Sequence, residues 1–431
     1  MYLTLYLAIL FAYLPGTVAV WKWRKLALFP LLVWYYFGMV LFLAIGSYKV
    51  MTAPVLIGSL FSHTYVLMLI SQVAILYIFA WPYVYYAKTP QKPKRYKRDD
   101  FLPWLLMALA ICVLGVYYAK IGNFLIFDLL AGKINRLNIL DYRLMTYGLP
   151  DYPFYRMGFL VLPALAAAAA VLNAGIRGCW RISDATVIVL CAIPPILLAE
   201  KAGILNYSAV IFIAYLLSRG FKGESIGISV GLRIITLVAA VFIPTALIYR
   251  LYFSLPGDGL GLILNQLVFR IFGVYSEALA ATVPFVEKFG FLHGTTVPNI
   301  KGLLPFERFN TEIQMHSFLA GGLENRRAGI AGTTPVPANG EGYLNFGVLG
   351  FLVFSVITSS TLIVFQELLN RFRLGVVGPL LVAWYGYLAM MLSTTTLFAT
   401  FLSITHTLLG LFLGMLGVLL SWWASSRGSR E

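Results

Sequence analysis

Residues 331–350 read AGTTPVPANGEGYLNFGVLG and join a long polar segment to an apolar run. The polar segment covers residues 254–344, mixes both charges and is rich in Gly and Pro. Almost everywhere else the sequence is typical of membrane-spanning helix. A polytopic protein that keeps one large polar segment at the mouth of its helix bundle has a place for chemistry or recognition. This junction therefore bears on both the fold and the function.

The composition is that of an integral membrane protein. Of 431 residues, 60% are hydrophobic and 11% are charged, whereas soluble domains carry about 25% charged residues. A spanning helix needs roughly 20 apolar residues, and residues 1–21 read as a retained first span because they lack the basic start of a signal peptide. We expect an all-α polytopic fold with about 11 transmembrane helices, near residues 1–21, 26–46, 64–86, 101–119, 158–174, 185–200, 204–218, 234–252, 345–366, 374–396 and 399–422.

Lys and Arg set the expected orientation, because short loops rich in these residues stay on the cytoplasmic side. The stretches WKWRK (21–25) and KTPQKPKRYKRDD (88–100) fall on one side, together with the basic loops at 177–181, 219–233 and 371–373. The N-terminus is then outside and the C-terminus is cytoplasmic. The net charge of +15 is mainly a consequence of this topology and gives no reason to expect a nucleic-acid partner.

Two outer loops carry most of the polar chemistry. In the first, NFLIFDLL (123–130) predicts an interfacial half-helix. In the second, apolar residues at helical spacing over 260–290 predict an amphipathic helix on the membrane or in a bundle cavity, and 301–327 predicts a mixed short helix. The chain thus divides into N-terminal membrane helices with an outer loop at 120–157 (1–253), a large extracytoplasmic loop with amphipathic helices (254–344), and C-terminal membrane helices with a short cytoplasmic tail (345–431).

Clustered arginines at a membrane mouth favour an anionic substrate, because a planar guanidinium makes paired, charge-assisted hydrogen bonds to phosphate oxygens. The alternative for each cation is contact with a lipid headgroup or with a nearby Asp or Glu. Lys201, at the outer joint between the sixth and seventh spans, adds a cation at membrane depth, where charge usually faces a cavity. The candidate substrate-binding cations are Arg136, Arg143, Arg156, Lys201, Arg270, Arg326 and Arg327.

Three outer residues are candidates for acid–base chemistry. Glu341 lies in a Gly-rich turn before a span, where it is either a general base for a sugar hydroxyl or a helix-capping carboxylate. Glu277 is a similar candidate, and His316 is either catalytic or a satisfied structural residue. The sequence contains no Walker A or HExxH motif, and its outer loops hold no DxD-like acidic pair. ATP-driven or metal-dependent chemistry is therefore disfavoured, and no cofactor is expected.

At residues 332–350 the chain resembles the Wzy-type polymerases of O-antigen and oligosaccharide repeat units. Members often show a Gly-Thr-x-Pro stretch and then a Gly-Glu-x-Tyr-x-Asn-Phe-Gly-x-x-Gly run that enters a late span. The spans and the large late outer loop fit the same family, although Lys201 stands where many relatives place an Arg. The matching positions are Gly332, Thr333, Pro335, Gly340, Glu341, Tyr343, Asn345, Phe346, Gly347 and Gly350.

The resemblance implies a glycosyltransferase that works at the periplasmic face of the cell inner membrane. A growing glycan on undecaprenyl diphosphate would move to the non-reducing end of another lipid-linked repeat unit. Tyr343 and Asn345 join the substrate-binding set on the strength of the motif. The implied partners are membrane lipids, the lipid-linked oligosaccharide, a chain-length regulator and a flippase of the same lipopolysaccharide or exopolysaccharide pathway. An O-antigen ligase and a polysaccharide flippase or exporter are the alternatives.

Overall fold

The computed structural model describes most of the helical chain. The described residues are 2–23, 31–52, 61–86, 99–133, 156–197, 201–221, 268–296, 309–319, 334–371 and 377–397, with single positions at 261, 265, 305, 410 and 413. Within these ranges every regular element is a helix. The predicted all-α class is therefore confirmed for the described part of the chain.

The described part of the chain contains sixteen helical elements. Three of them, η2, η3 and η4, are π-helical turns that continue into an α-helix or lead out of one. The elements are α1 (Tyr2–Trp23), α2 (Leu31–Gly38), η2 (Met39–Ala44), α3 (Ser47–Thr52), α4 (His63–Tyr86), α5 (Leu102–Ile121), α6 (Leu125–Leu130), η3 (Met157–Val161), α8 (Leu162–Arg177), α9 (Ile182–Leu197), α10 (Lys201–Phe221), η4 (Phe269–Gly273), α13 (Val274–Phe289), α14 (Thr311–Leu319), α16 (Ala338–Arg371) and α17 (Val377–Met391).

The described helices fit an all-α membrane protein. By length and composition, six helical runs could cross a membrane: Tyr2–Ala19, Leu31–Thr52, Leu102–Ile121, Met157–Arg177, Gly203–Gly220 and Ala338–Leu369. Three shorter apolar helices, His63–Phe79, Ile182–Leu197 and Val377–Met391, coincide with further predicted spans. The predicted spans 234–252 and 399–422 lie outside the described ranges, apart from single helical positions, so the count of eleven stays a prediction.

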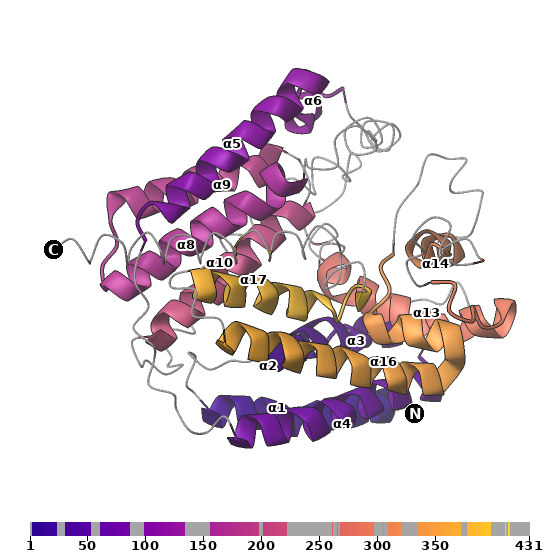
Figure 1. Cartoon of the computed structure of the whole chain (residues 1–431). Coiled ribbons are helices and arrows are strands. Elements are labelled where there is room, and N and C mark those ends of the chain that lie inside the picture. Colours follow the sequence, from indigo (N-terminus) through magenta and orange to yellow (C-terminus); the bar gives the residue numbers. More distant parts are fainter. Residues whose placement is uncertain are drawn as a thin grey trace.

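Helix α8 forms the centre of one half of the bundle. Every residue from Leu162 to Gly175 is buried, and α5, α9 and α10 pack around it (Figure 1). Its run of alanines lets neighbouring backbones approach closely, as small residues do between membrane helices. Gly175 shows how close: a Cβ there would lie 2.2 Å from Ser218 Cβ of α10.

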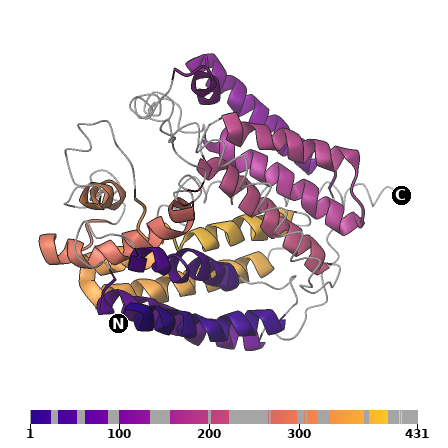
Figure 2. The same cartoon turned by 180° about the vertical axis from the view of Figure 1, so that it is seen from behind.

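The other half contains α1, α2, α4, α16 and α17, and it joins the first half where α17 contacts α8 and α10. Figure 2 shows the same two groups of helices from behind. Large apolar side chains on the outward faces of α1, α4, α5, α9 and α16 are exposed, with Phe11, Ile78 and Val189 each more than 60% accessible. Such faces suit contact with lipid rather than water.

Contacts between helix termini define two ends of the bundle. At one end, the ring of Tyr2 meets Phe61 and the ring of Tyr6 meets Tyr48, so α1, α3 and α4 have termini side by side. This end also carries α14 and the bend of α16, where the helix turns back on itself as a hairpin after the non-helical residues Phe346 and Gly347 (Figure 1). We name it the hairpin end. The start of α9 and the end of α8 lie at the opposite end of the bundle, which we name the ion-pair end.

Candidate functional site

Helix α16 reverses direction within the motif that carries the family resemblance. Phe346 (φ −142°, ψ 20°) and Gly347 (φ 66°, ψ −149°) are non-helical. The Asn339 Nδ2 group donates to Ser355 Oγ at 2.9 Å, although 16 residues separate the two. A straight helix would hold them about 24 Å apart. Residues 338–345 (the short arm) and 348–371 (the long arm) are therefore antiparallel arms of a helical hairpin, visible at the bend of α16 in Figure 1.

Two glycine features permit this reversal. Gly347 adopts a positive φ, a conformation that residues with a Cβ atom rarely adopt. Gly342 and Gly350 face each other across the hairpin, where a Cβ on Gly342 would lie 2.4 Å from the carbonyl oxygen of Gly350. Glycine at both positions lets the two backbones touch, as in close helix pairs in membranes.

The hairpin changes the expected boundary of the large outer loop. Residues 338–344 were expected in that loop, but every residue of the short arm is buried. The Ala338 N–H group donates to the Leu392 carbonyl at the end of α17. The last part of the predicted polar segment is therefore a helix inside the bundle, and the long arm coincides with the predicted span 345–366.

The described parts of the polar segment pack onto this hairpin. The expected amphipathic helix is present as η4 and α13, and its face from Ala278 to Val283 is buried in the bundle. The expected mixed short helix is present as α14. A separate apolar cluster joins these elements to the short arm and consists of Ala281, Phe285, Met315, Val336 and Leu344.

Asn345 ties the end of the short arm to the turn that follows α13. Its Oδ1 accepts from the Gly294 N–H group at 2.7 Å, and its Nδ2 donates to Thr296 Oγ1 at 2.7 Å and to the Glu341 carbonyl at 2.8 Å. The side chain is fully buried. These contacts engage both ends of the amide within the protein, and the part of Asn345 in substrate binding stays a prediction. Tyr343 is also buried and belongs to the main hydrophobic core.

His316 lies on α14 and contacts the segment that leads into the short arm. Its Nδ1 is 3.1 Å from Thr334 Oγ1, and the Thr334 N–H group donates to the carbonyl of Glu312 on α14 at 3.1 Å. The two contacts join α14 to residues 334–337, which lead into the short arm. His316 is thus linked to the hairpin through Thr334.

Glu341 lies in the first turn of the short arm and is 1% exposed. A carboxylate removed from water is stable only where donors or a cation compensate it, and an ionisable group within a membrane bundle is a functional candidate by default. Its position near a helix N-terminus also fits the helix dipole. Glu277 is half-buried in the first turn of α13, a helix that packs against α16.

Most predicted cations cannot be placed beside these acids. Arg136, Arg143, Arg326 and Arg327 lie outside the described residues. Only the backbone is described for Lys201, the first residue of α10, and for Arg270, which lies in η4 directly before α13. Arg156 is exposed and precedes η3.

Lys49 is a cation near η4 that the sequence did not single out, because it follows a long apolar run. Its Nζ donates to Asn265 Oδ1 at 2.7 Å. A Cβ added to Gly273 of η4 would lie 3.2 Å from Lys49 Cβ. Lys49 therefore lies against the element that carries Arg270, at the hairpin end.

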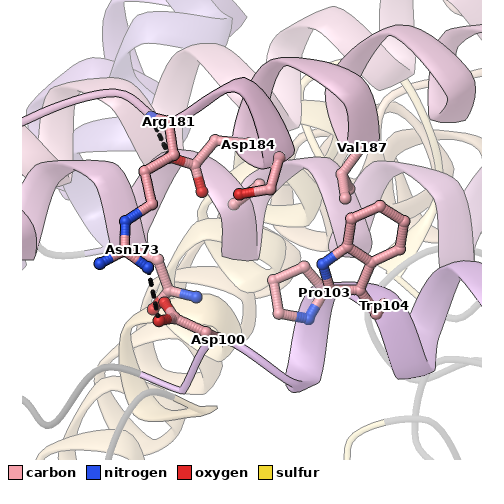
Figure 3. A pocket seen from close by; sticks show the side chains of 9 residues that line it. Asp100, Pro103, Trp104, Asn173, Arg181, Asp184 and Val187 are labelled. Atoms are coloured by element: carbon pink, nitrogen blue, oxygen red, sulfur yellow. Dashed lines mark hydrogen bonds and ion pairs between the residues drawn. The ribbon is translucent and has the colours of Figure 1, made fainter.

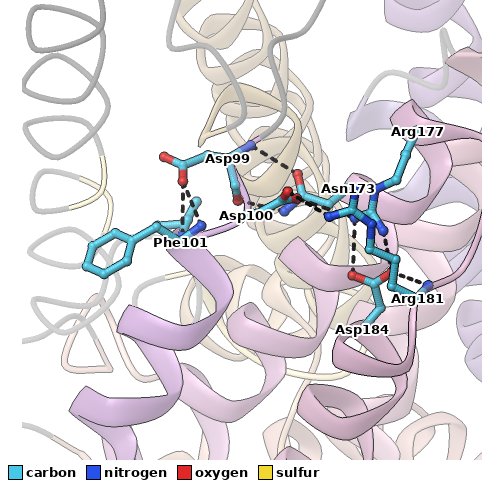
Figure 4. Close-up of polar contacts among 8 residues, drawn as sticks. Asp99, Asp100, Phe101, Asn173, Arg177, Arg181 and Asp184 are labelled. Atoms are coloured by element: carbon cyan, nitrogen blue, oxygen red, sulfur yellow. Dashed lines mark hydrogen bonds and ion pairs between the residues drawn. The ribbon is translucent and has the colours of Figure 1, made fainter.

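A second polar cluster occupies the ion-pair end (Figure 4). Arg177 donates to both carboxylate oxygens of Asp184 at 3.0 and 3.3 Å and to Asp100 at 3.3 Å. Arg181 also pairs with Asp100 at 3.3 Å. Gly178, at φ 89°, ends α8 and lets the chain turn back into α9. Arg177 and Arg181, two of the residues expected as orientation signals, are thus paired with the carboxylates of Asp184 and Asp100.

Asp99 and Asn173 complete this cluster. Asp99 Oδ1 accepts from the N–H groups of Phe101 and Leu102 just before and at the start of α5, and Asn173 Nδ2 donates to the Asp99 carbonyl at 2.7 Å. A cavity of about 40 Å³ beside it is lined by Asp100, Trp104, Asn173, Arg181 and Asp184 among others (Figure 3). That space admits only a few water molecules, so this cluster is better suited to holding α5, α8 and α9 together than to binding a sugar.

Comparisons with protein-family models, with curated proteins and with solved structures gave no match. The resemblance to the Wzy-type polymerases therefore rests on residues 332–350 and on the order of spans and loops. In the described part of the chain, no group of three or more His, Cys, Asp or Glu side chains is arranged to hold a metal ion.

Proposed function

We propose that the chain is a membrane glycosyltransferase that polymerises lipid-linked glycan repeat units at the hairpin end. The observation that carries this proposal is the fold of the motif itself. The segment that resembles the polymerases forms a helical hairpin whose short arm buries Glu341. Glu277 lies on α13, which packs against that hairpin. His316 lies on α14, which packs against α13, and Arg270 lies in η4, which leads into α13.

The reaction needs two kinds of group. An acceptor hydroxyl attacks the anomeric carbon of the donor, the new glycosidic bond forms, and the bond to the lipid diphosphate breaks. Glu341 takes the hydroxyl proton as general base. The departing diphosphate gains negative charge, which the predicted arginines stabilise. We retain Arg143, Arg156, Arg270 and Arg327 as the proposed diphosphate ligands, with Glu277 and His316 as alternative bases.

The depth of Glu341 favours substrates that are anchored in the membrane. Exposed apolar residues on the long arm run from Leu349 to Leu368, a helical length of about 29 Å. This matches a hydrocarbon core of about 30 Å, so the hairpin bend lies at one membrane surface. Glu341, six residues before Gly347 on the short arm, lies about 9 Å below that level. Lipid-linked sugars enter at this depth more easily than soluble nucleotide sugars.

The same hairpin gives some support to the exporter alternative. Secondary transporters often place substrate sites at discontinuous helices within the membrane, and α16 is such a helix. The ligase alternative shares the lipid-diphosphate donor and differs only in the acceptor. The two alternatives are therefore separable by product.

The direct test uses the full-length protein in lipid vesicles with undecaprenyl-diphosphate-linked repeat units. A polymerase converts them into a ladder of glycans that differ by one repeat unit. A single transfer product, formed only when a lipid A core acceptor is added, would replace the proposal with a ligase. Transfer of intact repeat units across the vesicle membrane without new glycosidic bonds would replace it with an exporter.

A further inference from the structure

A chain of buried polar side chains crosses the bundle and ends on the hairpin. Gln72 Nε2 of α4 donates to Tyr35 OH of α2 at 2.8 Å, and Tyr35 OH donates to Asn339 Oδ1 at 3.1 Å. Asn339 Nδ2 then donates to Ser355 Oγ at 2.9 Å, and Ser355 Oγ donates to the Phe351 carbonyl at 2.8 Å. None of the four side chains is more than 2% exposed.

The donors in this chain all point the same way, from α4 through α2 to the long arm. Hydrogen bonds arranged in one direction reinforce one another, particularly where the surroundings are apolar. Asn339 accepts with its oxygen and donates with its nitrogen, so both ends of its amide are fixed. The network therefore sets the rotation and the depth of the short arm against three other helical segments.

Stability alone does not account for such a network. Gln72 Oε1 is buried without a hydrogen-bond partner in the described part of the chain, and such a group is costly inside a bundle. Apolar side chains of similar shape would fill the same space without that cost. Asn339 precedes Glu341 by two residues on a helix, so the two side chains point to different sides of the short arm.

We propose that Gln72, Tyr35, Asn339 and Ser355 are positioning residues that hold the short arm so that Glu341 keeps its catalytic position. This inference rests on the proposed function for its catalytic consequence. Its structural half, control of the short arm, is independent of any activity. None of the four side chains needs to touch the substrate.

The first experiment measures amide hydrogen exchange in the full-length protein in vesicles, in Tyr35→Phe and in Tyr36→Phe. Tyr36 is the matched control because it is also buried on α2 but bonds to α1, donating to the Tyr13 carbonyl and contacting Thr17 Oγ1 at 2.9 Å. Loss of the Tyr35 hydroxyl should speed exchange over residues 338–345 by about tenfold or more. Tyr36→Phe should leave that peptide at the wild-type rate. Equal exchange of the short arm in Tyr35→Phe and wild type would overturn the proposal.

The second experiment distinguishes positioning of Glu341 from a role in stability alone, in which the hydrogen bonds only pair buried polar groups. In Gln72→Leu/Tyr35→Phe/Asn339→Leu the hydroxyl and both of its amide partners become apolar, which should recover most of the melting temperature lost by Tyr35→Phe. If the network positions Glu341, kcat should stay about tenfold or more below wild type while KM changes little. Recovery of kcat together with the melting temperature would reduce the network to a structural role.

The two experiments also keep this inference apart from the proposed function. If Tyr35→Phe speeds exchange of the short arm but the wild-type protein forms no ladder, the polymerase proposal is wrong and the network still controls the hairpin. If the wild-type protein forms a ladder and Tyr35→Phe changes neither exchange nor kcat, the polymerase proposal stands and the positioning role of the network is wrong.

Discussion

The two ends of the bundle use polar residues in opposite ways. At the ion-pair end, Arg177 and Asp184 neutralise each other at 3.0 Å, and their side chains are only 7% and 8% exposed. At the hairpin end, hydrogen bonds between amides and hydroxyls support the break in α16, and a buried carboxylate, Glu341, lies on the short arm before that break. Charges that pair within the protein fix helices in place, whereas under the proposed function the supported break in α16 holds a group for chemistry.

The largest effect should come from the hairpin end. In Glu341→Gln the side chain keeps its size but can no longer accept a proton, so the initial rate of ladder formation should fall about a hundredfold or more. Glu287→Gln, on the exposed last turn of α13, is the control and should keep the wild-type rate. A Glu341→Gln protein with more than a third of the wild-type rate would exclude Glu341 as the base.

The hairpin itself can be broken at its glycine contact. In Gly342→Ala the new Cβ would lie 2.4 Å from a backbone oxygen of the long arm, which should cost about 2–3 kcal/mol of folding free energy. The control is Gly115→Ala on α5, where a Cβ has no neighbour within 4 Å and a helix gains from alanine. Thermal unfolding in detergent measures both. If the two variants unfold at the same temperature, the arms are not in contact.

The ion-pair end should respond in stability and not in turnover. Arg177→Ala leaves the buried Asp184 without its bidentate partner and should lower the free energy of unfolding by about 2 kcal/mol. The rate of ladder formation per folded molecule should stay within about twofold of wild type, because this cluster lies at the opposite end of the bundle from the bend of α16 (Figure 1). A selective loss of turnover with normal stability would show that the comparison between the two ends is wrong.

The smallest effect is expected at the rim of the same cluster. Arg181 is 50% exposed and pairs with Asp100, which is 45% exposed. Arg181→Ala should therefore change the free energy of unfolding by less than about 1 kcal/mol, and added salt should reduce the difference further. A larger loss than that of Arg177→Ala, measured by the same unfolding curves, would show that the buried pair is not the more stabilising one.

Much of the described fold could be predicted because local pattern and length determine it. The spans around α5, α8 and α10 follow from apolar runs of sufficient length, and α6 and α14 follow from short helical spacing within polar loops. Element α13 was also expected, as a helix on the membrane or in a cavity, and the structure favours the bundle. The sequence pattern could predict a helix there but not which surface it would contact.

The hairpin and the polar clusters could not be predicted in this way. Ala338–Leu369 has the length and mean hydropathy of one spanning helix, and the turn back appears only in the three-dimensional structure, in the dihedrals at Phe346 and Gly347 and the contact of Gly342 with Gly350. The hydrogen bond between Tyr35 and Asn339 joins positions 304 residues apart, and Arg177 meets Asp100 across 77 residues. Such pairings depend on tertiary packing, which residue types and spacing do not encode.

The bend at Gly347 also affects how many times the chain is expected to cross the membrane. A straight helix of the length of Ala338–Arg371, 34 residues, would measure about 51 Å, far more than a bilayer core. Because the chain enters and leaves the short arm at the hairpin end, we expect the short arm to add no crossing and only the long arm to pass from one compartment to the other. Reporters fused after residues 310 and 347 should accordingly reach the same compartment, although a buried helix lies between them.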